Sequence, residues 1–412
     1  MHMKTASFIT TLVCATFATG ALFVPSIAQK SGTEKPGATK TGLESAAQTG
    51  SAKAAGAKTP AATTTPKGVT PIPSKGFSGE LTEIAKSNYQ WTGIAVSKKN
   101  RVFVCYPRWS NMGPVSTGEL LPDGSVSAFP DKKWNEWIQG GKVTGEEFIC
   151  VQSVYCDSNG TLWILDPAAP RFQGPITNGP KLVKVNLASN RVEKYYPLDE
   201  VAPKDCYLND VRIDTRRQVA YMTDSGLGAI VVLDLRTGNA RRVLETSPSV
   251  KAENIKVMID GKRWGVLSDG SVRKVHSDGI ALDKTGDYLY YQALTGKTLY
   301  RVATKELRNE KLAAKDLNAK VEKVATTCPA DGIEFGADGK LYITSIEDSS
   351  IKSMNVNGAN KELTTVIKDK QLVWPDSLAQ RGDGYFYVTC SQINLGPKAP
   401  TPYKIFRFKP KN

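Results

Sequence analysis

Histidine is nearly absent from this chain of 412 residues, which has only His2 and His276. A zinc site built on histidines is therefore excluded, and no Cys-x-x-Cys pair offers a thiolate alternative. A Ser–His–Asp triad would have to use His276, and no Gly-x-Ser-x-Gly turn is present to position a nucleophile. Phosphate-cradling loops of the G-x-x-x-x-G-K-[ST] or G-x-G-x-x-G type are also missing. These absences argue against serine-hydrolase, histidine–zinc and nucleotide-binding functions.

Concentrated runs of basic residues are missing too, although the formal net charge is +14. Residues 1–76 hold eight Lys, no Arg and two Glu, so part of the excess lies near the N-terminus. The remaining basic residues are scattered, whereas a nucleic-acid-binding protein usually gathers them on one face. We therefore expect no nucleic-acid partner.

Long apolar runs are absent except near the N-terminus, where residues 8–24 are mostly apolar and follow Lys4. Ser26 and Ala28 then supply small residues for cleavage before Gln29, as in a secretion signal. Residues 1–28 are therefore predicted to be removed. The mature chain should have no transmembrane segment and should be secreted, to the periplasm or the extracellular space.

Large apolar side chains are rare in residues 29–76, which are rich in Ala, Thr, Lys, Gly, Pro and Ser. Such a segment cannot bury enough apolar surface to offset its ordering entropy. It is predicted to be a disordered tether, and residues 77–412 are predicted to form the folded domain.

Six cysteines remain once Cys14 leaves with the signal. An even number in an exported chain is compatible with disulfides, and Cys150 and Cys156 are close enough in sequence for a local bridge. Several of the six lie in apolar strand patterns, where buried free thiols are equally compatible with the sequence. Both interpretations remain open.

An internal repeat determines the fold class. Each copy has a short apolar run, a polar turn that usually carries Asp, Asn or Gly, and a second run rich in aromatic and β-branched residues, as in a β-hairpin. Six copies occur, at residues 94–105, 154–165, 211–223, 280–292, 333–344 and 378–389. Further strands follow the hairpins, for example at residues 181–186 and 229–235. Long helical patterns are absent, so we predict an all-β, six-bladed β-propeller with a central channel.

The last repeat is followed by only one clear strand, at residues 403–408. The missing outer strand is predicted at residues 80–85, directly after the tether. Pairing of this N-terminal strand with the last blade would close the ring.

Several motifs together resemble the major royal jelly protein and insect yellow protein family, in its bacterial branch. The motifs are Tyr207-Leu208-Asn209-Asp210-Val211, Ala220-Tyr221-Met222-Thr223-Asp224-Ser225, Ser277-Asp278-Gly279-Ile280-Ala281-Leu282, Trp374-Pro375-Asp376-Ser377, Tyr387-Val388-Thr389-Cys390-Ser391-Gln392 and Pro107-Arg108-Trp109. The resemblance covers roughly residues 80–408. It implies a secreted six-bladed propeller, with relatives that bind aromatic biogenic amines or are linked to dopachrome conversion. A more distant resemblance is to gluconolactonase and regucalcin-like propellers, which hydrolyse lactones with a divalent cation.

In a propeller the first strand of each hairpin is the inner strand, which lies along the channel. The residues just before each inner strand should therefore converge at one mouth of the channel. Four carboxylates occupy this position, namely Asp210, Asp278, Asp331 and Asp376. Crowded carboxylates need a cation, a donor or a proton. With Asn209, three of them (Asp210, Asp278 and Asp331) form a candidate Ca²⁺ site, because oxygen ligands suit that ion. The competing interpretation is that each Asp only caps a turn.

Other side chains at the same mouth complete a candidate ligand site. The predicted ligand-binding residues are Trp91, Arg108, Gln152, Tyr207, Asn209, Asp278, Asp331, Trp374 and Asp376. The aromatic residues would stack on an aromatic ligand or face a cation, or else pack between blades. His276, two residues before Asp278, is the candidate general acid or base, although a histidine there can equally be a polar surface residue.

Three functions fit these features. The first is binding of a small aromatic or amine molecule in the channel, and the second is an enzyme, either a metal-assisted lactonase or a dopachrome-type isomerase. The third is a scaffold that binds another protein at the cell envelope. The sequence leaves the oligomeric state open.

Overall fold

The computed structural model describes residues 80–110 and 112–410. The predicted secretion signal and tether, residues 1–76, lie outside the described residues. Within the described part, no helix is both long and apolar enough to cross a membrane.

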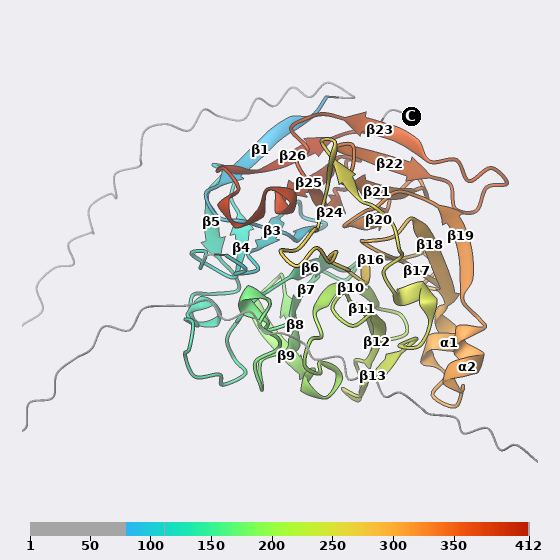
Figure 1. Cartoon of the computed structure of the whole chain (residues 1–412). Helices are drawn as coiled ribbons and strands as arrows, with labels where there is room; N and C mark the ends of the chain where they lie inside the picture. The colour runs from blue at the N-terminus through green and yellow to red at the C-terminus, as the bar shows by residue number, and fades with distance from the viewer. Residues whose placement is uncertain (1–79, 111, 411–412) are drawn as a thin grey trace, which may run out of the picture. The chain divides into compact units, whose positions relative to one another are not determined.

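Six four-stranded antiparallel sheets form the blades of a β-propeller (Figure 1). The first two blades are β2 (Ile94–Val96), β3 (Val102–Cys105), β4 (Thr117–Leu120) and β5 (Val126–Ala128), then β6 (Ser153–Cys156), β7 (Thr161–Asp166), β8 (Lys181–Asn186) and β9 (Arg191–Pro197). The next two are β10 (Leu208–Asp214), β11 (Val219–Asp224), β12 (Ala229–Asp234) and β13 (Ala240–Val243), then β16 (Ser277–Leu282), β17 (Tyr288–Ala293), β18 (Thr298–Ala303) and β19 (Glu322–Thr326). The last two are β20 (Ile333–Phe335), β21 (Leu341–Ser345), β22 (Ser350–Met354) and β23 (Thr364–Lys368), then β24 (Pro375–Gln380), β25 (Phe386–Cys390), β26 (Tyr403–Phe408) and β1 (Thr82–Ser87). Each predicted hairpin provides the first two strands of one blade, so the predicted fold class is confirmed.

The sixth blade combines strands from both ends of the described chain. β1 pairs antiparallel with β26, with Ser87 opposite Tyr403 and Thr82 opposite Arg407. The strand expected at residues 80–85 is thus found two residues later, at Thr82–Ser87.

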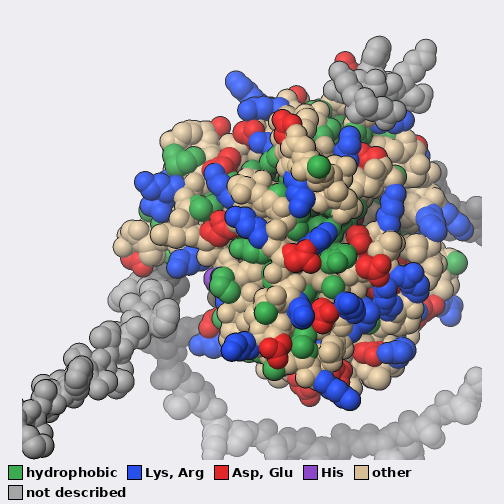
Figure 2. All heavy atoms as spheres, turned by 90° about the vertical axis from the view of Figure 1, so that its right-hand side faces the viewer, with side chains coloured by type: hydrophobic (Ala, Val, Ile, Leu, Met, Phe, Trp, Pro, Cys, Tyr) green, Lys and Arg blue, Asp and Glu red, His purple; other side chains and the backbone are tan. Residues whose placement is uncertain are grey.

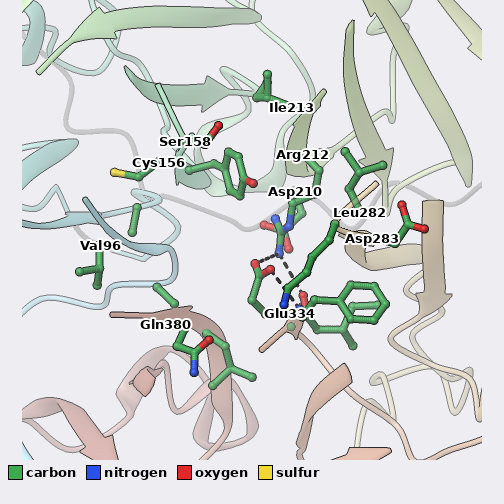
Figure 3. A pocket seen from close by; sticks show the side chains of 18 of the residues that line it. Val96, Cys156, Ser158, Asp210, Arg212, Ile213, Leu282, Asp283, Glu334 and Gln380 are labelled. Atoms are coloured by element: carbon green, nitrogen blue, oxygen red, sulfur yellow. Dashed lines mark hydrogen bonds and ion pairs between the residues drawn. The ribbon is translucent and has the colours of Figure 1, made fainter. Parts of the chain in front are cut away.

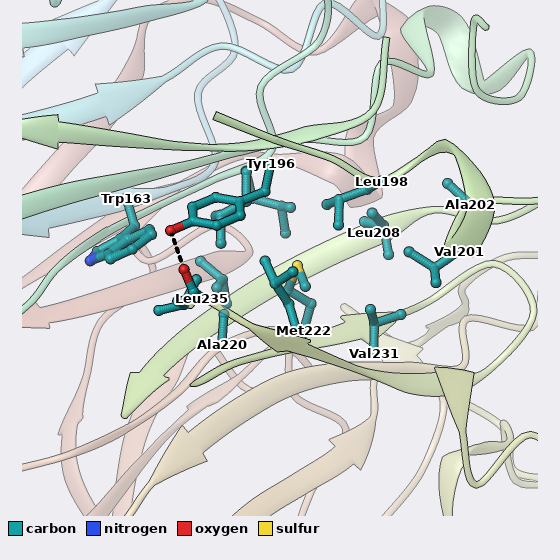
Figure 4. Packing of buried hydrophobic residues seen from close by; sticks show 14 of the residues in the cluster. Trp163, Tyr196, Leu198, Val201, Ala202, Leu208, Ala220, Met222, Val231 and Leu235 are labelled. Atoms are coloured by element: carbon teal, nitrogen blue, oxygen red, sulfur yellow. Dashed lines mark hydrogen bonds between the residues drawn. The ribbon is translucent and has the colours of Figure 1, made fainter. Parts of the chain in front are cut away.

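The apolar core is divided among the spaces between neighbouring blades. One cluster lies between the second and third blades, where Trp163 and Leu198 pack with Leu208, Met222 and other residues (Figure 4). The hydroxyl of Tyr196 donates a hydrogen bond to the Leu235 carbonyl across the same interface at 2.9 Å. Similar clusters fill the other interfaces, including the one between the sixth and first blades. Alternate residues of a strand point to opposite faces of its sheet. Each blade packs against a neighbouring blade on both sides, so its buried strands carry apolar residues on both faces.

Helices are few and short in the described part. Two α-helices, α1 (Thr304–Arg308) and α2 (Ala314–Asn318), connect β18 to β19. Single 3₁₀ turns occur at Lys133–Asn135, Pro170–Phe172, Asp199–Val201, Pro248–Val250 and Ile393–Lys398. A long connection between the third and fourth blades carries a small hairpin, β14 (Met258–Ile259) and β15 (Lys262–Arg263).

The state of the cysteines and the distribution of surface charge are both visible in the structure. All six cysteines of the described residues are free thiols, five of them buried, so the local bridge between Cys150 and Cys156 is not formed. Figure 2 shows basic and acidic side chains interspersed over one side of the propeller, without a continuous basic patch on that side.

Candidate functional site

Two cavities lie at the inner strands of the propeller. The upper cavity, of about 580 Å³, lies where the inner strands begin, and the lower cavity, of about 520 Å³, lies near the hairpin turns where they end. Six of the predicted ligand-binding residues line the upper cavity, namely Gln152, Tyr207, Asn209, Asp278, Asp331 and Trp374. The structure thus brings together residues from five different blades of the sequence.

A chain of hydrogen bonds runs through the floor of the upper cavity. The amide nitrogen of Asn209 donates to Asp278 Oδ1 at 2.7 Å. The Asp278 carboxyl is hydrogen-bonded to that of Asp331, and the indole N–H of Trp374 donates to Asp331 Oδ2 at 2.6 Å. Both aspartates are buried. Two adjacent carboxyls in such a place are stable when they share a proton.

The pKa values follow from this arrangement. Burial raises the pKa of Asp331 to about 7, although the hydrogen bond from Trp374 acts in the opposite direction. Burial and the neighbouring charge of Asp331 raise the pKa of Asp278 well above its ordinary value. Near neutral pH the pair therefore retains at least one proton. A carboxyl pair in this state can exchange its proton for a cation.

Irregularities at the starts of the inner strands separate the two cavities. The pairing of β10 with β11 shifts register between Leu208 and Val211, and as a result the consecutive residues Asn209 and Asp210 line different cavities. Close approach of neighbouring blades narrows the space between the cavities. A Cβ on Gly279 would lie only 2.6 Å from the Asp331 carbonyl oxygen, so this position requires glycine.

One wall of the upper cavity is an aromatic group of Trp109, Phe172 and Tyr207. The rings of Trp109 and Phe172 stack with centroids 4.9 Å apart, and Phe172 lies 5.3 Å from Tyr207. The indole N–H of Trp109 donates to the Tyr207 hydroxyl at 2.6 Å, and that hydroxyl donates to Gln152 Oε1 at 3.0 Å. These bonds fix the orientation of the wall, while Phe172 remains 53% exposed at the mouth.

A second aromatic pair faces the cavity from other loops. Trp264, from the connection between β15 and β16, packs on Trp374 with ring centroids 4.9 Å apart. Trp374 has a positive φ of 55°, which is rare for a large side chain and marks a backbone constrained by its surroundings. Trp374 in this conformation reaches Asp331 and still contacts Trp264.

Two predicted ligand-binding residues do not reach the cavity. Trp91 is fully buried between the sixth and first blades, and its indole N–H donates to the Lys404 carbonyl. Arg108 is also buried, and its guanidinium donates to backbone carbonyls, including those of Trp137 and Phe148. The structure corrects both predictions, because each side chain packs in the interior and donates to backbone carbonyls there, although the Arg108 Nε has no hydrogen-bond partner among the described residues.

Asp376, Asp210 and His276 also lie outside the lining of the upper cavity. Asp376 is buried beside Asp331, and burial raises its pKa well above the ordinary value. Asp210 lines the lower cavity instead. His276 Nδ1 accepts a hydrogen bond from the Ala252 backbone N–H, and burial lowers the pKa of this half-buried imidazole. The proposed acid–base role of His276 therefore has no support from its position.

The four residues predicted to bind calcium do not form one open ligand set. Asn209 turns its amide N–H toward Asp278, the Asp278 and Asp331 carboxyls bond to each other, and Asp210 faces the other cavity. Within residues 80–110 and 112–410, no three His, Cys, Asp or Glu side chains are grouped as a metal site. The residues in this arrangement do not fit a calcium ion.

Phe172 and Trp264 are site residues that sequence reasoning missed. Both lie in connections outside the repeated hairpin, where no periodic pattern indicates which cavity a side chain will face. Trp109 follows Arg108 in the Pro107-Arg108-Trp109 motif, and of the two only Trp109 lines the upper cavity.

The fold and the upper cavity define a six-bladed propeller with an aromatic-walled, acidic cavity at one end of its channel. The sequence profile of the major royal jelly protein family matches residues 149–409, and the chain belongs to this family. Among curated proteins, none gives a significant match.

Several solved structures are similar to the chain at low sequence identity. A luciferin-regenerating enzyme is 11% identical, with 80% of this chain and 95% of that chain covered and a TM-score of 0.49. A gluconolactonase from Xanthomonas campestris is 11% identical, with 80% and 89% covered and a TM-score of 0.48. Virginiamycin B lyase from Staphylococcus aureus is 15% identical, with 80% and 98% covered and a TM-score of 0.45.

Proposed function

We propose that the upper cavity binds a small aromatic molecule that carries a protonated amine. We also propose that the protein is secreted and binds this ligand outside the cytoplasm. The observation that carries this proposal is the hydrogen-bonded pair of Asp278 and Asp331 beneath two aromatic groups. An ammonium group at this floor would take the place of the shared proton.

Because Asp278 and Asp331 are buried, loss of their shared proton is favourable only when the ligand brings a positive charge to replace it. A buried carboxylate without a partner is costly, so the empty site keeps a proton. A bound ammonium donates up to three hydrogen bonds and restores charge balance when the proton leaves. The faces of Trp109, Tyr207 and Trp374 add attraction for the cation or for an aromatic ring attached to it.

A comparison of matched ligands tests the proposal. Tryptamine and phenethylamine should bind to the full-length mature protein in calorimetric titrations at pH 7.5. Their alcohol counterparts, tryptophol and phenethyl alcohol, should bind at least tenfold more weakly because they cannot replace the proton. Equal affinity for amines and alcohols, or no binding of either, would overturn the proposal.

A matched pair of variants links the binding to the floor. Asp278→Asn removes a carboxyl of the pair and should weaken amine binding at least tenfold. Asp123→Asn changes an exposed turn between β4 and β5 and should leave the affinity unchanged.

An isomerase of the dopachrome type is a second candidate, and the pKa of Asp331 favours it. A carboxyl with a pKa of about 7 can both remove and return a proton near neutral pH. The test is conversion of dopachrome by the protein, with Asp331→Asn expected to abolish turnover. Amine binding without turnover would leave the binding function and reject the enzyme.

A further inference from the structure

The lower cavity lies at the opposite end of the channel from the proposed amine site. The strands β6, β10, β20 and β24 all contribute residues to its lining, together with the hairpin turns that follow them. Figure 3 shows Asp210, Arg212 and Glu334 directed toward one another in this cavity, with Cys156 and Gln380 farther out.

A buried ion pair forms the innermost part of the lower cavity. Arg212 Nη2 lies 3.0 Å from Glu334 Oε2, and the two side chains are only 7% and 19% exposed. Arg212 also donates to the carbonyls of Val211 and Ile333, at 2.8 and 3.0 Å. Its guanidinium lies over the ring of Tyr155, 5.2 Å from the centroid. The Arg212 Nε is buried without a hydrogen-bond partner among the described residues.

The other cations at this mouth are committed to backbone carbonyls. Lys284 Nζ donates to the Ala337 carbonyl at 2.5 Å, and Arg216 donates to the Thr285 carbonyl. Asp283, from the same turn, accepts backbone N–H bonds from Asp287 and Tyr288. Of the charged side chains that line the cavity, Arg212 and Glu334 form an ion pair with each other, while Lys284 and Arg216 have their donors occupied by backbone carbonyls.

We propose that the lower cavity is a second binding site, for a small neutral polyhydroxylated molecule such as a hexose or an inositol. Each hydroxyl of such a ligand both donates and accepts, so neighbouring hydroxyls can bond Glu334 and Arg212 without breaking the ion pair. A ligand carboxylate at Arg212 would have to displace Glu334, and a ligand cation at Glu334 would have to displace Arg212, and breaking a largely buried pair is costly. Tyr155 and Phe335 are partly exposed and line the same cavity, so its wall also carries apolar surface for the C–H groups of a sugar ring.

The proposed polyol site and the proposed amine site share no lining residue. Asn209 lines only the upper cavity and Asp210 only the lower one, although they are consecutive residues. Variants can therefore be assigned to one cavity, and failure of one proposal does not imply failure of the other.

The test is saturation-transfer NMR on the mature protein with D-glucose, D-galactose, D-mannose and myo-inositol at millimolar concentrations. Arginine and citrate serve as ionic comparators. We expect saturation transfer to at least one polyol and none to the comparators. No transfer to any polyol, or transfer only to an ionic compound, would overturn the proposal.

Two variants locate the binding. Glu334→Gln keeps the shape but removes the acceptor charge, and it should weaken polyol binding at least tenfold. Because that change leaves Arg212 without its partner and can affect folding, Ser158→Trp provides a second variant. Ser158 is an exposed turn residue of the lower cavity, so a bulky side chain there should obstruct the site without disturbing the core. Asp278→Asn should leave polyol binding unchanged, whereas unchanged binding in both lower-cavity variants would reject the assignment.

Discussion

The indole N–H of Trp374 donates to the Asp331 carboxylate across 2.6 Å, and this bond joins the sixth blade to the floor of the upper cavity. A hydrogen bond to the charged form of an acid lowers its pKa, so Trp374 opposes the effect of burial on Asp331. The residue therefore does more than supply an apolar wall.

Replacing Trp374 with Phe should raise the pKa of Asp331 by about one to two pH units, since hydrogen bonds to charged groups contribute about 1.5–3 kcal/mol. Amine binding at pH 7 should weaken by roughly tenfold, because removing the proton becomes harder. The measurement is calorimetric titration with tryptamine at several pH values. Trp264→Phe is the matched control, since it changes the neighbouring ring and keeps the donor to Asp331. An equal shift of the pH profile in both variants would contradict the role assigned to the bond.

The affinity for amines should increase as the pH rises toward neutrality. In the empty protein the pKa of Asp331 is raised to about 7, and a bound ammonium should lower it, so binding releases a proton. Below pH 7 the association constant should rise by up to tenfold per pH unit, and it should level off above that until the amine itself loses its proton near pH ~10. Titrations from pH 5 to pH 8.5 give the profile. Asp331→Asn should flatten it, and a flat profile in the unmodified protein would contradict proton exchange.

Asp331 should make the protein less stable as the pH rises from about 4 to about 7. Its folded-state pKa is raised above the unfolded value of about 3.9, so its favourable contribution is complete below that value and is lost through pH 7. The loss is up to about 1.4 kcal/mol per pH unit over this window. Urea unfolding of the native protein and of Asp331→Asn at pH 5 and pH 8 isolates the contribution. Relative to the variant, the native protein should be less stable at pH 8 than at pH 5, and the opposite order would show that the carboxylate is better stabilised than its burial suggests.

The blades could be predicted because each one repeats a local signal. The alternation of apolar residues around an Asp- or Gly-containing turn specifies a hairpin without reference to the rest of the chain. The six copies then require an arrangement that buries both faces of every hairpin. The position of β1 beside β26 followed from the strand missing in the last blade.

The direction of individual side chains could not be predicted in the same way. Asn209 and Asp210 belong to one motif, yet a register shift sends them to different cavities. Arg108 Nη1 and Trp91 Nε1 donate to carbonyls that are distant in sequence, and no local pattern indicates such partners. All four aspartates were predicted at one mouth from their shared position near the start of an inner strand, and of these Asp278 and Asp331 line the upper cavity.

The free cysteines lead to a prediction about redox sensitivity. Five of the six thiols are buried, and burial raises the pKa of Cys105 to about 12, which suppresses the reactive thiolate. A thiol reagent should label the native protein slowly at pH 7.5 and label all six cysteines after unfolding. A reducing agent should leave the melting temperature unchanged. A fall in melting temperature on reduction would reveal a disulfide and contradict the free-thiol arrangement.

The arrangement of the carboxyls also predicts the response to calcium. Asp278 and Asp331 satisfy each other and accept bonds from Asn209 and Trp374, so the floor of the cavity needs no ion for stability. A chelator should therefore change the melting temperature by less than about 1 °C, because it lowers stability only when it removes a cation that is bound to the folded protein. The same melting curves with added Ca²⁺ at pH 6 and pH 8 complete the test. Since the pair retains protons at pH 6, any calcium binding should appear only at pH 8, where it should compete with tryptamine. A marked loss of stability in chelator at both pH values would mean that the aspartates hold a cation in the native protein, and it would favour the lactonase over the amine-binding function.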